Sequence, residues 1–312
     1  MNNFSDLIII SREVKSALTS NRPVVAFESA VITHGLPYPT NLELALEMEM
    51  IAENHHVVPA TIALINGKIH VGLSKSQITE LSQNNKTHKI STKDLAISVS
   101  NQWYGGTTVA ATLVIAQLVG ISVFATGGIG GVHRNSNFDI SNDLLELSRN
   151  PVITVCAGAK SILDLPATLE YLETMGVPLL GFQTDEFPAF YSRTSGLKVT
   201  HKVETTSEIV DVFKHQKSLK LQNAILVVNP IPKESEIEKS IVENYIQNAI
   251  KDAENEGIHG PEATPYLLEK VAINSSGVTV ASNLALLKNN AHLACKIATE
   301  ITSRFISKKR II

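Results

Sequence analysis

A lysine that directly follows a strand-like segment is the residue with the most distinctive chemistry in this sequence. Residues 152–156 are mostly β-branched, which favours a buried strand, and small residues then lead to Lys160, after which a helix is predicted from about 161 to 175. An amine held there loses water, and desolvation lowers the pKa of a lysine because it favours the neutral form. A neutral amine can form a Schiff base with a carbonyl carbon. The pattern therefore indicates carbonyl chemistry at Lys160, although a solvated lysine at a helix start would share it.

Two further groups follow predicted strands. Glu28 ends an apolar strand at residues 24–27, where burial would raise its pKa toward that of a working general acid; a solvated loop carboxylate is the alternative. Glycines at 127–131 follow a strand at 121–126, so backbone N–H groups could approach an anion, and His133 could donate to a phosphate. The glycine loop matches neither a Walker motif nor a dinucleotide fingerprint, and a tight packing turn would look the same.

A pair of carboxylates, Asp139 and Asp143, opens a helix predicted at 139–147. They are either a cap and a first-turn acid or oxygen ligands for Mg²⁺ or Mn²⁺. Nothing in the sequence resembles the His/Cys cluster of a zinc site. Lys89 ends a polar segment at 81–89 that is predicted to be a loop, before a strand predicted at 95–99, and it could bind phosphate or face water. Asn283, at the start of a predicted final helix, is either an N-cap or a partner for an amide-like ligand.

The predicted elements position these residues at one edge of a sheet. Strands and helices alternate, which predicts a three-layer α/β/α fold with a mostly parallel sheet. Asn66-Gly67 between two strand-like runs predicts a type I′ hairpin, so the sheet should be mixed. No long linker or repeat divides residues 1–312, which predicts a single α/β domain. In such sheets ligands bind beyond the carboxyl ends of the strands, where Glu28, the glycine loop and Lys160 all fall.

Composition narrows the class of protein. The chain has 312 residues, 44% of them hydrophobic and 18% charged, with a net charge of -3, so no general attraction to nucleic acid or an anionic membrane is expected. The apolar run at residues 7–10 is too short for a signal peptide, and no stretch reaches transmembrane length. Cys156 and Cys295 are far apart and read as reduced thiols. We expect a cytoplasmic protein.

Taken jointly, these segments resemble the pseudouridine-5′-phosphate glycosidase family. The similarity includes Ala157-Gly-Ala-Lys160, Thr126-Gly-Gly-Ile-Gly-Gly131 and Asn229-Pro-Ile-Pro232. It spans roughly residues 11–300 in one order, at 27–41, 58–62, 106–112, 124–134, 139–141, 155–164, 168–174, 185–191, 229–232, 264–268 and 289–291. The resemblance implies reversible cleavage of the C–C glycosidic bond of pseudouridine 5′-phosphate to uracil and ribose 5-phosphate, with a divalent metal, typically Mn²⁺, in a homotrimer.

The resemblance also implies residue roles. Lys160 matches the nucleophile that forms an imine with the ring-opened sugar, Glu28 matches the acid that protonates the ring oxygen, and Asp139 matches the metal-bound acid. The positions that match sugar-phosphate contacts are Lys89, Thr126, His133, Ser141 and Asp143. Those that match positions around the base are Thr108, Val109 and Asn283.

The sequence departs from the family in places. Thr92 and Lys93 stand where two arginines are usual, and the loop at 134–138 is shorter than usual. Two other readings stay open: a Schiff-base aldolase acting on a sugar phosphate, and a non-catalytic sugar-phosphate binding protein. The aldolase would use the same lysine, whereas the binding protein would need no buried amine.

Overall fold

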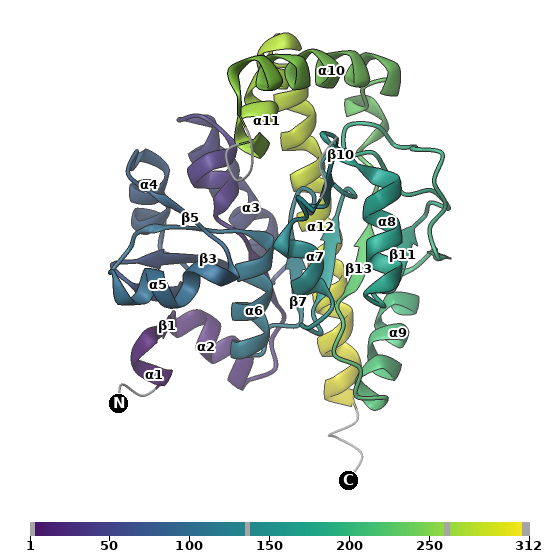
Figure 1. The fold of residues 1–312 in the computed structure, drawn as a ribbon. Coiled ribbons are helices and arrows are strands. Elements are labelled where there is room, and N and C mark those ends of the chain that lie inside the picture. The colour runs from purple at the N-terminus through teal and green to yellow at the C-terminus, as the bar shows by residue number, and fades with distance from the viewer. Residues whose placement is uncertain (1–3, 135–137, 259–262, 308–312) are drawn as a thin grey trace.

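The central feature of the structure, a computed structural model that describes residues 4–134, 138–258 and 263–307, is a mixed sheet (Figure 1). Eleven strands form it, in the order β1-β4-β3-β2-β7-β9-β13-β11-β12, and β6 pairs with both β3 and β5. The strands are β1 Ile8–Ile10, β2 Val24–Phe27, β3 Val58–Ile65, β4 Lys68–Val71, β5 His88–Ile90, β6 Gly105–Thr107, β7 Val123–Ala125, β9 Ile153–Cys156, β11 Leu179–Phe182, β12 His201–Val203 and β13 Ile225–Val228. A separate pair joins β8 Val132–His133 and β10 Leu163–Asp164.

Helices cover both faces of the sheet, which confirms the predicted layered α/β architecture. They are α1 Phe4–Leu7, α2 Arg12–Thr19, α3 Thr40–Asn54, α4 Lys75–Gln83, α5 Leu95–Ser100, α6 Val109–Val119, α7 Asn142–Leu147, α8 Leu165–Thr174, α9 Thr206–Ser218, α10 Lys239–Glu256, α11 Ala263–Asn274 and α12 Val278–Ser307. Figure 1 shows α12 running behind the strands, while α6, α7 and α8 lie in front. None of the helices in the described ranges has the length and apolar character of a bilayer span.

The core strands are parallel and buried on both sides. Every residue of β2, β9 and β13 is buried, as expected for parallel strands with helices on both faces. Strand β7 pairs in parallel with β2 and β9, placing Ala125 opposite both Phe27 and Val155. The carboxyl ends of these strands therefore meet at one edge, so the residues that follow them converge there.

The predicted hairpin is confirmed. Strands β3 and β4 pair antiparallel, with Ile65 opposite Lys68, and Asn66 and Gly67 have φ values of 49° and 71°. Positive φ at both central residues defines the type I′ turn, whose twist matches that of the strands. The hairpin supplies the antiparallel part of the mixed sheet.

The strand predicted at 95–99 is wrong, because this segment is helix α5. Ser91 and Asp94 form a reciprocal capping box, in which the Asp94 carboxylate accepts from the Ser91 N–H at 3.1 Å. That box starts a helical turn before Leu95, and β-branched residues then continue it. The strand near this position is β5, which overlaps the end of the segment 81–89 that is predicted to be a loop.

Three predicted helix starts also move. The helix expected from residue 161 begins at Leu165, where the Asp164 side chain accepts from the Ala167 N–H at 3.0 Å. Helix α7 begins at Asn142 with Ser141 as its cap, so Asp139 lies before the helix and does not cap it. Helix α12 begins at Val278, which makes Asn283 an internal residue and rules out the N-cap alternative.

Candidate active site

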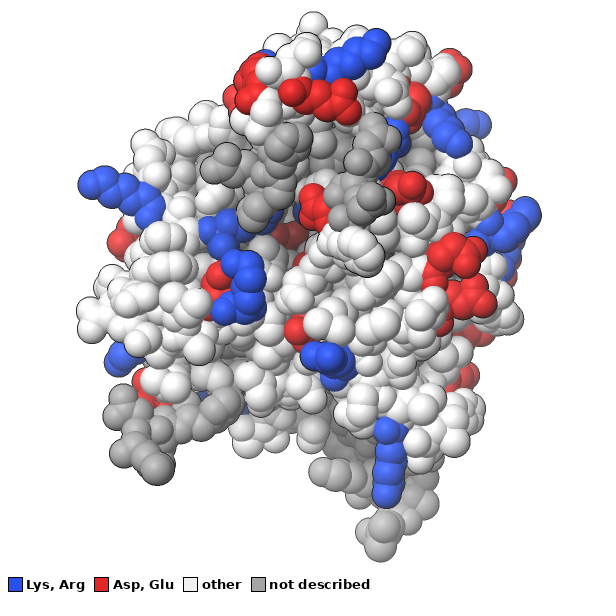
Figure 2. All heavy atoms as spheres, in the orientation of Figure 1, with Lys and Arg blue, Asp and Glu red and all other residues white. Residues whose placement is uncertain are grey.

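A cavity opens at the carboxyl ends of β2, β7 and β9. Its volume is about 70 Å³, which is smaller than the roughly 300–1,000 Å³ of typical small-molecule sites, and its mouth is open to solvent. Figure 2 shows basic and acidic side chains mixed around the hollow on this face. The residues that line it are Glu28, Ala30, Val31, His34, Gly35, Lys89, Gly127, Gly128, Lys160, Phe190, Thr264, Pro265, Leu268, Asn283 and Leu287.

Glu28 follows β2 and precedes a single π-helical turn, Val31–Gly35, a feature that is common at functional sites. Its Oε1 accepts a hydrogen bond of 2.6 Å from the Thr126 hydroxyl. Burial raises the pKa of Glu28, and the positive charge of Lys160 and the bond from Thr126 oppose that rise. Because burial is the largest of these influences, the carboxyl keeps its proton to a higher pH than an exposed glutamate does, which suits a general acid.

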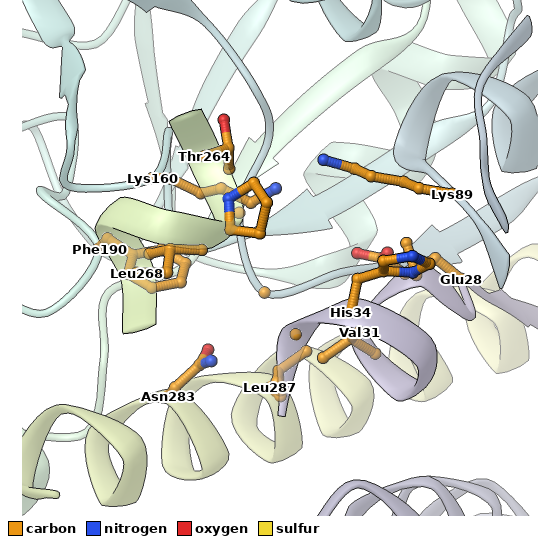
Figure 3. A pocket seen from close by; sticks show the side chains of 15 residues that line it. Glu28, Val31, His34, Lys89, Lys160, Phe190, Thr264, Leu268, Asn283 and Leu287 are labelled. Carbon is orange, nitrogen blue, oxygen red and sulfur yellow. The ribbon is translucent and has the colours of Figure 1, made fainter. Parts of the chain in front are cut away.

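Lys160 follows β9 after a turn built from small residues. Its backbone N–H donates to the Ile129 carbonyl at 3.0 Å, which attaches the lysine backbone to the glycine loop. Gly158 has a φ of 89°, and a Cβ there would lie 2.2 Å from the Pro188 carbonyl oxygen, so only glycine fits. The tight turn points the half-buried lysine into the cavity (Figure 3).

Lys89 provides a second amine from the opposite side. It lies in β5, is half-buried, and points toward the same space as Lys160 (Figure 3). Burial lowers the pKa of Lys89, and the positive charge of Lys160 lowers it further, whereas Asp143 and Glu28 oppose the shift. The neighbouring Lys93 instead pairs with Asp94 at 2.6 Å and has a side chain 74% exposed, so it does not line the cavity.

The predicted phosphate-side residues lie around the glycine loop. Asp143 is buried, and its two oxygens accept from the N–H groups of Ala110 at 2.9 Å and Gly130 at 2.8 Å. A Cβ on Gly130 would lie 2.1 Å from the Ser141 hydroxyl oxygen, so glycine is required for this packing. The Asp143 carboxylate thus holds the loop in place, which is a structural role beyond the predicted substrate contact.

His133 and Asp139 lie side by side at the far end of that loop. The His133 Nδ1 is 4.0 Å from the Asp139 Oδ2, and its Nε2 is 3.3 Å from the Thr264 hydroxyl oxygen. Burial lowers the pKa of His133, while the Asp139 carboxylate opposes that shift. Thr264 begins the lining contributed by α11, so His133 links the glycine loop to that helix.

The chemistry of the donor set decides which metal could fit at Asp139. Within the described ranges no three His, Cys, Asp or Glu side chains are grouped as a metal site, and Asp143 is already occupied by backbone donors. A single carboxylate, with a side chain 36% exposed, suits a hard cation that keeps most of its waters, such as Mn²⁺ or Mg²⁺. It does not suit a closed zinc site.

Of the three residues predicted around a base, Asn283 lines the cavity from α12 (Figure 3), whereas Thr108 and Val109 do not. Thr108 caps α6 by accepting from the Ala111 N–H at 3.4 Å, and Val109 is only 2% exposed. Neither Thr108 nor Val109 lines the cavity, because the first caps a helix and the second packs in the core.

Helix α12 also fixes the segment that contains Thr126, the hydrogen-bond partner of Glu28. Asn290, fully buried, donates from Nδ2 to the carbonyls of Thr126 at 2.8 Å and Gly127 at 3.4 Å. Its Oδ1 accepts from Asn229 at the end of β13, at 3.1 Å. These bonds fix the segment that carries the Thr126 hydroxyl, and thereby the partner of Glu28.

Several lining residues were not predicted. Phe190 has a φ of 63°, and a Cβ on Gly128 would lie 2.6 Å from its ring. An aromatic residue in the left-handed region is unusual and marks a constrained site, and no sequence pattern indicates this backbone conformation. His34 and Leu287 reach the cavity from the π-turn and from α12, and the sequence carried no spacing signal for either.

Comparison with known proteins gives a consistent result. The family model described as indigoidine synthase A like protein matches residues 13–300. A protein of Staphylococcus aureus (strain MW2) named pseudouridine-5′-phosphate glycosidase is 48% identical over 96% of this chain and 99% of its own length. A protein of Caldanaerobacter subterraneus subsp. tengcongensis with the same name is also 48% identical, over 98% of this chain and 99% of its own.

Two solved structures have the same fold. An indigoidine synthase A (IdgA)-like protein of Thermotoga maritima has a TM-score of 0.87 and 35% identity, with 95% of this chain and 97% of that chain covered. The prealnumycin C-glycosynthase AlnA, solved in complex with ribulose 5-phosphate, has a TM-score of 0.89 and 35% identity, with 96% and 99% covered.

Proposed function

The chain belongs to the indigoidine synthase A-like family, and we propose that it is a pseudouridine-5′-phosphate glycosidase, the name that its curated relatives carry. The reaction is the reversible cleavage of the C–C bond between uracil and the sugar of pseudouridine 5′-phosphate, to give uracil and ribose 5-phosphate. The observation that supports the proposal is that Lys160 and Glu28 both line one cavity. A related structure that binds ribulose 5-phosphate supports a sugar phosphate as ligand.

A lysine suits this bond better than the carboxylate pair of ordinary glycosidases. A carbon leaving group departs with difficulty, so the sugar carbon C1′ needs an electron sink. Glu28 gives its proton to the ring oxygen as the C1′–O4′ bond breaks and the Lys160 Nζ bonds to C1′, and the Glu28 carboxylate then takes the proton that the nitrogen loses. When the C1′–C5 bond breaks, Glu28 gives that proton to C5 of uracil, while the nitrogen lone pair forms the C1′=N bond of a protonated imine. Water adds to C1′ and releases ribose 5-phosphate, and the ammonium group of Lys160 returns a proton to Glu28.

The remaining polar groups would hold the substrate and a metal. We propose that Lys89, which lines the cavity, and His133, which lies beside Asp139, bind the anionic end, and that Asn283 binds the base. We propose that Asp139 binds one hydrated Mn²⁺, which would supply positive charge near the sugar oxygens when bound.

Two amines face the cavity, so the experiment must separate them. Wild type, Lys160→Ala and Lys89→Ala are each incubated with ribose 5-phosphate and borohydride, and the modified peptide is identified by mass spectrometry. We expect a reduced adduct on Lys160 in wild type and in Lys89→Ala, and none in Lys160→Ala. Uracil release from pseudouridine 5′-phosphate should be abolished in Lys160→Ala.

The other possible outcomes would indicate a different nucleophile or a different function. An adduct on Lys89 would reassign the nucleophile to that lysine, whose pKa is lowered by burial. An adduct on Lys160 without any uracil-dependent synthesis of pseudouridine 5′-phosphate would favour an aldolase. Absence of any adduct would favour a binding protein without catalytic function.

We further propose that the protein works as a homotrimer in the cytoplasm. The trimer rests on the resemblance to the family, and the compartment is supported by two buried free thiols, Cys156 and Cys295. Light scattering coupled to size-exclusion chromatography tests the trimer directly, and a monomer mass at assay concentration would overturn it.

A further inference from the structure

Arg134 makes three directed contacts close to the reactive lysine. Its Nε donates to the Leu163 carbonyl at 3.1 Å and its Nη2 to the Ser161 carbonyl at 3.0 Å. Its Nη1 donates to Glu243 Oε1 on α10 at 2.5 Å. The guanidinium therefore binds two neighbouring carbonyls with one planar fork and is held there by a carboxylate on its other side.

The two carbonyls belong to the turn that carries Lys160. The Leu163 N–H donates to the Lys160 carbonyl at 3.0 Å, which closes a turn over residues 160–163. This turn is part of neither a helix nor the main sheet. Its position depends on the Ile129 carbonyl before it, on the short β8–β10 pairing after it, where Leu163 lies opposite His133, and on Arg134.

Arg134 points away from the substrate. It does not line the cavity that holds Lys160, but borders a separate hollow together with Glu243. Its side chain is 21% exposed, and each of its three nitrogens has an acceptor in the protein. It therefore does not supply the phosphate contact that a basic residue after His133 could have made.

We propose that Arg134 is a positioning residue that sets the rate of imine formation by fixing the turn of Lys160. The inference rests on the proposed function, because it assumes that the Lys160 amine is the nucleophile. Attack on C1′ requires the amine within about 3–3.5 Å along a defined direction, and a displacement of about 1 Å can cost 100-fold in rate. Lys89 would bind the substrate from β5, on the opposite side of the cavity from the turn, so affinity should change less than rate.

The test compares Arg134→Ala, Arg134→Lys and Glu243→Gln with wild type. For Arg134→Ala we expect kcat and the single-turnover rate of borohydride-trappable adduct to fall about 10- to 100-fold. KM should change less than about threefold, because the phosphate and base contacts stay in place. Millimolar methylguanidine should restore part of the trapping rate, since it can occupy the vacated fork. Arg134→Lys, with a single donor group, should be intermediate.

Glu243→Gln is the matched control. The glutamine keeps an oxygen acceptor for Nη1 and leaves both carbonyl bonds, so its trapping rate should stay within about twofold of wild type. If Arg134→Ala is too unstable to purify, Arg134→Lys decides the matter, and a wild-type trapping rate there overturns the proposal. A lowered melting temperature with unchanged kcat in Arg134→Ala also overturns it. If wild type itself traps no adduct on Lys160, the proposed function fails, which is a distinguishable result.

Discussion

Glu49 should make the stability of the protein depend on pH. It lies in α3, is 7% exposed, and accepts a 2.8 Å hydrogen bond from the Thr61 hydroxyl on β3. Burial raises its pKa from 4.5 to about 7, partly offset by the bond from Thr61. The folded protein thus keeps a proton on Glu49 over a pH range in which the unfolded chain has lost it.

The sign of the effect follows from that difference. Below pH 4.5 both states bind the proton, and above about pH 7 both have lost it. Between these values the unfolded state binds fewer protons, so the free energy of unfolding falls as pH rises. The difference between the unfolded pKa of 4.5 and the folded pKa of about 7 corresponds to about 3 kcal/mol of unfolding free energy. This stability is lost as pH rises, and the loss is complete above pH 7.

Glu49→Gln isolates this contribution. The amide carries no charge and can still accept from Thr61, so the variant should match wild type near pH 4.5 and exceed its stability by about 3 kcal/mol at pH 8. Melting curves at pH 5 and pH 8 should show a gap between the two proteins that widens by about 5 °C. All other titrating groups are shared and cancel in the comparison. An equal pH dependence of the two melting temperatures would refute the reasoning.

Three further predictions concern the site. Thr126→Val removes the hydroxyl that donates to Glu28, so the pKa of Glu28 should rise. The limb of the kcat/KM profile that depends on the protonated acid should then extend to higher pH. If this limb does not move, it belongs to the titration of another group. Gly128→Ala places a methyl group 2.6 Å from the Phe190 ring and should raise KM about tenfold, whereas an unchanged KM would show that the ring yields freely. Asp139→Ala should remove stimulation by Mn²⁺ in a uracil-release assay, and a preserved response would place the ion elsewhere.

The parts of the fold that could be predicted depend on local signals. The Asn66-Gly67 hairpin follows from two residues that tolerate positive φ, and the core strands follow from β-branched runs. Residues 95–99 carry the same β-branched signal but form α5, because the capping box at Ser91 outweighs it. Helix starts were missed where a short pairing such as β8–β10 intervenes, since that pairing depends on residues 30 positions apart.

The candidate site also contains residues whose position could be predicted from the sequence and residues whose position could not. Glu28, the glycine loop at 127–131 and Lys160 could be placed near one another because parallel strands end at a common edge. Phe190 and His34 could not, because they reach the cavity through irregular backbone whose course is set by packing. The second role of Asp143, as an acceptor for two backbone N–H groups, likewise requires the contact between α7 and α6.

Helix α12 gives the site an order of assembly. It contributes Asn283 and Leu287 to the cavity, and Asn290 holds the carbonyls of Thr126 and Gly127. During translation it leaves the ribosome after every other described element, so the amine of Lys160 is synthesised long before its surroundings are complete. A growing or prematurely terminated polypeptide therefore carries Lys160 without the α12 residues that enclose the cavity, and the cavity is complete only when the final helix docks.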